Sequence, residues 1–377
     1  MQKLICKYSK YCGGCNDLDK SYEELVKEKE NYLKSLFKNF KDATFHNSII
    51  NYYPYKYRNK VHLAFGENKG KTLIGFYEEN SNKITDIDSC LMHDKWLNTL
   101  IAIIREYLSR FKIRAYKNGN GILRYLHARC INNNLQLTLV AITDNFAGRD
   151  WLYKKLCENF NQVSFYLNIN RRTDNAIFGD RFKHIAGEKF LKFNFAQVDC
   201  VLTPSSFLQV NLPIAEKMYK KAIELLDITK NTTVIDLYSG IGITSVMFSR
   251  LAKNVFAIEE VSGATSNAKI IAKINNSNNI HILTGKCEDK INSLKLDECE
   301  DVVLFVDPAR LGLNKRVIDV IREINPRKIV YMSCNPESCL NDIKLLTTDN
   351  KYGVCDIYMG DMFPYTKHIE SLVCLCG

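Results

Sequence analysis

The stretch Lys328-Ile-Val-Tyr-Met-Ser-Cys-Asn-Pro336 decides the fold of the second half of the chain. Its apolar run is typical of a strand buried on both faces, and Pro336 ends the strand because proline cannot extend a ladder of hydrogen bonds. Open α/β sheets place ligands at the carboxyl ends of their strands, so the polar end of this strand should face a substrate. We interpret Cys334 as a nucleophile; the alternative is a buried structural cysteine, since free Cys is among the most buried residue types.

Strands alternate with helical segments on both sides of this stretch. The seven strand candidates lie at 232–238, 254–259, 279–284, 301–307, 327–333, 351–359 and 369–376. Such alternation indicates an α/β fold with a doubly wound, Rossmann-like sheet. No helix separates the last two candidates, so we expect the seventh strand to be an antiparallel hairpin partner. The pattern changes near residue 200, which predicts two domains, 1–200 and 201–377.

The first domain has a different pattern, in which short strands follow one another. Residues 57–65 and 72–77 alternate like a hairpin, and so do 122–129 and 135–141. A capping box, Ser21-Tyr-Glu-Glu24, opens a helix ahead of them. We therefore expect an α+β domain rich in antiparallel strands.

Composition and length describe an ordinary globular protein. The 377 residues are 46% hydrophobic and 25% charged, enough for two domains with their own cores. We see no apolar stretch of membrane-spanning length and no secretory segment at the start, and we expect a cytoplasmic protein without membrane association or an obligate protein partner. The 14 cysteines should then be thiols, metal ligands or nucleophiles rather than disulfides.

Positive charge is concentrated in the first domain. Residues 1–200 hold 32 Lys and Arg against 21 Asp and Glu, whereas 201–377 hold 20 against 21. Such a half favours nucleic acid, and the aromatics in Tyr52-Tyr-Pro-Tyr-Lys-Tyr-Arg58 could stack on bases. Lys60 and Arg124 are further candidates for an RNA-facing surface, with solvated surface charges as the alternative.

Four cysteines are candidate ligands of a metal group. Cys6, Cys12 and Cys15 are separated by five and two residues, with glycines that let the backbone fold tightly around a ligand. Cys90 is the best candidate for a fourth ligand because it follows a predicted hairpin that could return the chain to its start. Zinc and an iron–sulfur cluster both suit cysteine ligands, and free thiols are the third possibility.

A glycine-containing turn ends the first strand of the second domain, in Val234-Ile-Asp-Leu-Tyr-Ser-Gly-Ile-Gly242. Glycines there allow a ligand close to the backbone, and Glu259 at the end of the next strand could accept hydrogen bonds from a ribose hydroxyl. Dinucleotide binding is the rival interpretation. Against it, Ser245 stands at the third glycine position of the dinucleotide fingerprint.

Two further motifs complete the set, Phe305-Val-Asp-Pro-Ala-Arg-Leu-Gly312 and Asp361-Met-Phe-Pro-Tyr-Thr-Lys-His-Ile-Glu370. With the stretch around Cys334, they resemble in order and spacing the RNA uracil-5-methyltransferase family. Ser239 and Ser338 depart from it, since relatives often have Cys and Thr there.

The resemblance implies a seven-stranded S-adenosylmethionine-dependent methyltransferase fold. It also implies residues that contact S-adenosyl-L-methionine, namely Gln209, Tyr238, Glu259 and Asp307. Many family members carry a 4Fe-4S cluster on cysteines spaced like Cys6, Cys12 and Cys15, with a distant fourth. Cluster-bearing relatives act on 23S ribosomal RNA, which is the expected substrate here, with transfer RNA as the alternative.

The chemistry of the family explains why these residues occur together. Uracil C5 is a weak nucleophile, but addition of the Cys334 thiolate at C6 creates an enolate whose C5 can attack a methyl donor. Glu370 would then remove the C5 proton. Two alternatives explain these residues less well. Transfer of a methyl group to an amino group does not use a cysteine nucleophile such as Cys334. A noncatalytic RNA-binding protein would not require Cys334, Asp307 and Glu370 together.

Overall fold

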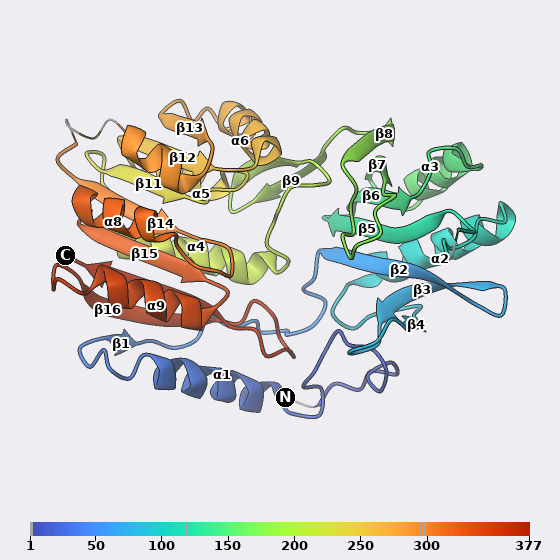
Figure 1. Cartoon of the computed structure of the whole chain (residues 1–377), viewed down its shortest axis with the longest axis horizontal. Helices are drawn as coiled ribbons and strands as arrows, with labels where there is room; N and C mark the ends of the chain where they lie inside the picture. Colours follow the sequence, from blue (N-terminus) through green and yellow to red (C-terminus); the bar gives the residue numbers. More distant parts are fainter. Residues whose placement is uncertain (1–2, 118, 295, 297–298) are drawn as a thin grey trace.

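A sheet of eight strands organises the second half of the chain (Figure 1). In the computed structural model, which describes residues 3–117, 119–294, 296 and 299–377, its order is β1-β16-β17-β15-β14-β11-β12-β13. The strands are β1 (Thr44–Phe45), β11 (Thr233–Leu237), β12 (Asn254–Glu259), β13 (Ile280–Thr284), β14 (Val302–Val306), β15 (Lys328–Ser333), β16 (Gly353–Gly360) and β17 (Glu370–Cys376).

This sheet confirms the expected Rossmann-like fold. Strands β11 to β15 pair in parallel, and β17 pairs antiparallel with both β15 and β16. The last strand is therefore the hairpin partner that the missing helix predicted. The eighth strand, β1, was not expected; Thr44 pairs in parallel with Asp356 of β16.

Helices cover both faces of the sheet because alternate strand residues point to opposite sides. Val234, Val303 and Val330 pack on one face, and Ile235, Leu304 and Ile329 on the other. The first face is covered by α4 (Leu212–Leu226), α5 (Ile243–Ser249) and α6 (Ser262–Ile274). The second is covered by α1 (Tyr22–Leu36), α8 (Lys315–Ile324) and α9 (Pro336–Leu346), while α7 (Cys287–Lys290) and the 3₁₀ turn η1 (Ile291–Ser293) lie at its edge.

A second sheet of seven strands lies in the first half, in the order β4-β3-β2-β5-β6-β7-β8. The strands are β2 (Lys60–Asn68), β3 (Lys71–Tyr77), β4 (Ile84–Asp86), β5 (Leu123–Ile131), β6 (Asn134–Ala141), β7 (Gln162–Ile169) and β8 (Arg181–Gly187). All neighbours are antiparallel except β6 and β7, which α3 (Arg149–Cys157) connects. Its apolar face packs on α2 (Lys95–Arg110) and α3.

The polar face of this second sheet is turned toward the connection between the two halves. Gln136 Nε2 donates to the Leu202 carbonyl oxygen at 2.9 Å, and the buried Arg129 guanidinium donates to the Ser206 carbonyl oxygen. The small hairpin of β9 (Leu191–Phe195) and β10 (Val198–Leu202) leads the chain to this point. The connection near residue 200 is thus held by side chains of the first half.

The segment that holds α1 and β1 lies with the second half rather than the first (Figure 1). Leu33 and Phe37 belong to the core around β14 and β15, and β1 extends that sheet. The division into 1–200 and 201–377 stays a prediction. These contacts add that α1 and β1, from the first range, pack within the sheet of the second.

One pair of cysteines departs from the expectation of free thiols. Cys355 and Cys376 form a disulfide, because the β16–β17 hairpin brings their Cα atoms to 6.2 Å. The four candidate ligand cysteines and Cys334 are free. Within the described ranges, no helix has the length and apolar character needed to cross a membrane.

Candidate active site

A thiol and a carboxyl meet at the ends of two neighbouring antiparallel strands. Ser333 of β15 lies opposite Ser371 of β17, so the next positions in the same register are Cys334 and Glu370. Glu370 is only 2% exposed, whereas Cys334 is half-buried. The strand pairing therefore brings together the two residues that the sequence assigned to catalysis.

A second carboxyl comes from the parallel neighbour β14, which Asp307 follows directly. Burial raises the pKa of Glu370 well above its usual range, and nearby Asp307 raises it further. Burial and the carboxyl of Asp236 likewise raise the pKa of Asp307, to about 7. Because a neighbouring negative charge disfavours ionisation of a carboxyl, burial and Asp307 both favour the protonated form of Glu370.

Arg310 and the two carboxyls have opposite effects on the pKa of the Cys334 thiol. Burial raises the pKa of Cys334, and the carboxyls of Glu370 and Asp307 raise the pKa of this thiol further. The Arg310 guanidinium lowers the pKa of the thiol by its charge and by a hydrogen bond. Arg310 Nη2 lies 2.9 Å from His368 Nδ1, and Asn335 Nδ2 donates to the Arg310 carbonyl oxygen at 2.9 Å. Burial lowers the pKa of His368, so its neutral ring can accept from Arg310.

Arg310 and His368 lie in the two motifs around Asp307 and Glu370, but no role at the thiol was expected for either of them. The available signal was position: Arg310 lies in a polar run that follows a strand neighbouring the one that ends before Cys334. The geometry shows a cation held in place beside the thiol. A fixed cation stabilises a thiolate relative to a thiol.

A pocket lies at the end of β11. Gln209, Tyr238 and Asp307 line it, as does Gly240 in the turn before α5. Gln209 Nε2 donates to Asp307 Oδ2 at 3.5 Å. Three of the four residues expected to contact the methyl donor therefore line one pocket.

The fourth residue, Glu259, lies beside the pocket and accepts hydrogen bonds from backbone N–H groups, including that of Gly240 in the pocket wall. Its carboxylate accepts from the N–H of Gly240 at 3.0 Å and from that of Val261 at 2.7 Å. Gly242 in the same turn has φ +78°, and an added Cβ would lie 2.9 Å from Ala268 Cβ, so glycine is required there. Glu259 is thus a support of the turn, with lone pairs left for a ribose.

The departure from the dinucleotide fingerprint has a structural reason. Ser245 Oγ donates to buried Asp236 Oδ2 at 2.6 Å, and Thr244 Oγ1 donates to the same oxygen at 2.8 Å. Both hydroxyls come from the first turn of α5. They satisfy one oxygen of a buried carboxyl near the end of β11, which a glycine at position 245 could not do.

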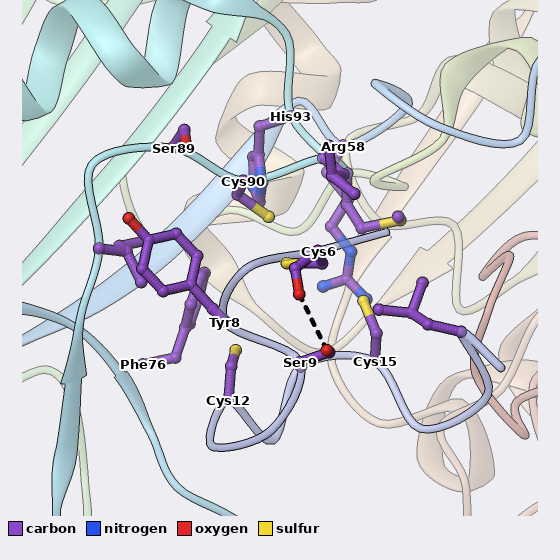
Figure 2. Close-up of a pocket in the computed structure, with 15 residues that line it drawn as sticks. Cys6, Tyr8, Ser9, Cys12, Cys15, Arg58, Phe76, Ser89, Cys90 and His93 are labelled. Carbon is purple, nitrogen blue, oxygen red and sulfur yellow. Dashed lines mark hydrogen bonds between the residues drawn. The ribbon is translucent and has the colours of Figure 1, made fainter. Parts of the chain in front are cut away.

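The four candidate ligand cysteines line one pocket at the edge of the second sheet (Figure 2). Cys6, Cys12 and Cys15 come from the N-terminal segment, and Cys90 follows β4. Burial raises the pKa of Cys15 to about 12, and neighbouring cysteines contribute. Among the described residues, no group of three or more His, Cys, Asp or Glu side chains is arranged to hold a metal ion.

The basic residues named as RNA candidates have different surroundings. Arg58 lines the cysteine pocket, so its side chain is half-buried instead of facing solvent on a strand. Arg124 Nη1 donates to the carbonyl oxygen of Arg172 at 2.7 Å and to Asn170. Lys60 lies over the ring of Phe207, which is 62% exposed and lines the pocket at the end of β11.

Comparison with known proteins identifies the family. The model of the tRNA (Uracil-5-)-methyltransferase family matches residues 21–376. The chain belongs to this family. It is 31% identical over 371 residues to an uncharacterized RNA methyltransferase of Oceanobacillus iheyensis, covering 96% of this chain and 81% of that protein. A relative from Clostridium acetobutylicum is 32% identical over 379 residues, with 98% and 82% covered.

A solved structure supports the same assignment. The Pyrococcus abyssi tRNA (uracil-54, C5)-methyltransferase in complex with S-adenosyl-L-homocysteine superposes with a TM-score of 0.79 and 25% identity. The match covers 97% of this chain and 86% of that one. Together with the family, this identifies an S-adenosylmethionine-dependent RNA methyltransferase and confirms the resemblance found in the motifs.

Proposed function

We propose that this protein methylates C5 of a uridine in 23S ribosomal RNA. The observation that carries the reaction is the pairing of a half-buried thiol, Cys334, with a buried carboxyl, Glu370, at the ends of two neighbouring strands. Transfer of a methyl group to an amino group would need neither. An RNA substrate also makes the cytoplasm the expected location.

The first step belongs to Cys334. Its thiolate forms a bond to C6 of the uracil, and the electrons of the C5=C6 double bond move toward O4 as an enolate. Arg310 is the group that lowers the pKa of this thiol against the influence of burial and two carboxyls. We assign Arg310, with His368 holding it, the task of stabilising the thiolate.

Methyl transfer follows at C5. The enolate carbon attacks the methyl carbon of S-adenosylmethionine, the bond from that carbon to sulfur breaks, and its electron pair stays on sulfur. We assign Gln209, Tyr238 and Asp307, which line the pocket, to binding the donor, and Glu259 to holding the turn that carries Gly240.

The last step belongs to Glu370. It takes the proton from C5, the electrons of the C–H bond reform the C5=C6 double bond, and the thiolate leaves C6. A carboxyl whose pKa burial has raised is a stronger base when ionised than an exposed one, which suits this task. The proton can then pass to solvent or be shared with Asp307 between turnovers.

The choice of 23S ribosomal RNA rests on the four-cysteine pocket, because relatives with such a set act on that RNA. Transfer RNA is the second candidate, since the Pyrococcus abyssi enzyme with the similar fold acts on uracil 54 of tRNA. The lysines and arginines of the first half would bind the phosphate backbone in either case.

We also propose that Cys6, Cys12, Cys15 and Cys90 hold a 4Fe-4S cluster. Zinc also suits cysteine ligands, and the choice of a cluster rests on the resemblance, since many family members carry one on cysteines spaced in this way. The four cysteines line one pocket, so that each could supply one thiolate to such a cluster. Such a cluster would supply a redox-active group of net negative charge.

The proposal is tested with purified protein, labelled methyl donor and transcripts of 23S ribosomal RNA and of tRNA. We expect 5-methyluridine in the 23S transcript, found by nucleoside mass spectrometry, and no product with Cys334→Ala. If 5-methyluridine is found in the tRNA transcript alone, tRNA replaces 23S ribosomal RNA as the substrate. A methylated amino group on any base would contradict the reaction.

A further inference from the structure

Arg58 lies between the cysteine pocket and the segment 361–370, which carries Glu370. Figure 2 shows its guanidinium entering the pocket beside Cys15, and Cys90 lines the same pocket. The ionisable groups that influence its charge are Tyr57, Cys15 and Cys90. Among the described residues it forms no ion pair with a carboxylate, so its charge has thiols for neighbours and no acidic partner.

On its other side, Arg58 contacts the segment 361–370. Its guanidinium lies 5.9 Å from the centre of the Phe363 ring and 5.7 Å from that of Tyr57. Arg58 Nε donates to Tyr57 Oη at 3.3 Å, and Tyr57 Oη donates to the Pro364 carbonyl oxygen at 3.3 Å. A shift of the guanidinium would therefore be felt at two consecutive residues of the segment.

The same contacts continue to the catalytic thiol. The Phe363 ring packs edge-on against His368, with 5.6 Å between ring centres. His368 Nδ1 meets Arg310 Nη2 at 2.9 Å, and Arg310 is the cation beside Cys334. Packed side chains with defined contacts are the physical route by which one site can position another.

We propose that Arg58 is a positioning residue that couples the cysteine pocket to the catalytic segment. This inference rests on the proposed cluster and on the proposed reaction. Four thiolates around an iron–sulfur core would carry net negative charge, and the Arg58 guanidinium lines the pocket that would hold it. Loss of that charge releases the guanidinium, and with it the contacts that hold Phe363 and Pro364.

A second contact joins the same two regions but does not involve the guanidinium. The Asn16 N–H donates to the Tyr365 carbonyl oxygen at 3.2 Å, directly after Cys15. Folding of the cysteine loop can therefore support the segment in two ways. The experiment must separate the charge of Arg58 from the backbone contact, and a comparison of loaded and stripped protein in two variants does so.

The test compares wild type with Arg58→Met, which keeps the length and apolar stem but loses the charge. Hydrogen exchange of peptides spanning 361–370 is measured anaerobically before and after removal of iron with a chelator. In wild type we expect removal to speed exchange of this segment. In Arg58→Met we expect fast exchange already in the loaded protein and a much smaller response to iron removal, because interacting groups are not additive.

The kinetic readout is the rate of methyl transfer in a single turnover. We expect Arg58→Met to lower that rate by up to about a hundredfold, since small misplacement of catalytic groups has this effect, while RNA affinity stays that of wild type. Arg58→Lys should recover part of the rate because it restores charge without the planar fork. Arg110→Met is the matched control, an exposed arginine stacked on Trp151 at 5.4 Å, and should behave as wild type.

Two results would overturn the inference. Equal responses of wild type and Arg58→Met to iron removal would mean that the coupling runs through the backbone contact alone. Lost RNA affinity with unchanged exchange would make Arg58 an RNA contact. Failure of the proposed function is distinguishable, because wild type would then make no 5-methyluridine while exchange still reported the coupling. If Arg58→Met does not fold, Arg58→Gln, which also removes the charge, carries the same comparison.

Discussion

Replacing Glu370 with glutamine should separate the two halves of the reaction. Glutamine keeps the shape of the side chain in a position only 2% exposed, so water has little room to act as a substitute base. Loss of a general base slows its step by about a hundred- to ten-thousand-fold, roughly 3 to 5 kcal/mol in barrier height. Addition should be unaffected or faster, because the carboxyl that raises the pKa of Cys334 is gone.

The assay is a denaturing gel of labelled RNA after reaction with each variant. Glu370→Gln should leave methylated RNA attached to the protein, Cys334→Ala should give no adduct, and Cys339→Ala should still form one. Cys339 is fully buried, and burial raises its pKa, so it is a poor nucleophile despite its place near Cys334. Release of 5-methyluridine from Glu370→Gln at the wild-type rate would refute the assignment of the base.

Four further results are expected. Anaerobically purified protein should be brown with about four iron atoms per chain; stoichiometric zinc without iron or sulfide would contradict the cluster. Lys60→Met and Arg124→Met should each reduce the salt dependence of RNA affinity by about one unit of slope if they contact phosphates, and unchanged slopes would exclude them from the interface. Arg310→Met should move the pH profile of adduct formation to higher pH, because this cation lowers the pKa of Cys334; an unshifted profile would leave Arg310 without that task. Glu370→Gln should gain thermal stability over wild type as pH rises, since the pKa of Glu370 is higher folded than unfolded and its ionisation costs stability above the unfolded value; equal pH dependence would argue against a raised pKa.

Most of the eight-stranded sheet was predictable because its signals are local. Apolar runs alternate with helical segments, and seven strands found in the sequence correspond to β11 through β17. The pairing of β1 was not predictable. It has two residues, too few for any periodicity, and its partner Asp356 is far along the chain.

The candidate site was predictable where a motif carried it. Cys334, Asp307 and Glu370 follow or begin apolar strands, and parallel strands bring such ends to one edge. The place of Arg58 was not predictable. The alternating sequence around Arg58 resembled a solvent-facing strand. Strand β2 begins only at Lys60, however, and the Arg58 N–H donates to the Met92 carbonyl oxygen. The Arg58 side chain therefore lines the cysteine pocket.

The same limit applies to the disulfide and to Glu259. The hairpin that joins Cys355 to Cys376 depends on long-range register, which cysteine spacing alone does not give. Glu259 was expected at a ribose because of its position after the second strand. The backbone N–H groups that it accepts from are visible only once the turn around Gly240 is folded.

The central claim is tested most directly by mapping 5-methyluridine in the ribosomal and transfer RNA of cells with and without this protein. The method is mass spectrometry of RNA fragments, which gives both the modified base and its position. We predict that one or more 5-methyluridines in 23S ribosomal RNA disappear without the protein, return with the wild-type chain and stay absent with Cys334→Ala. An unchanged set of 5-methyluridines in both RNA classes would contradict the proposed function.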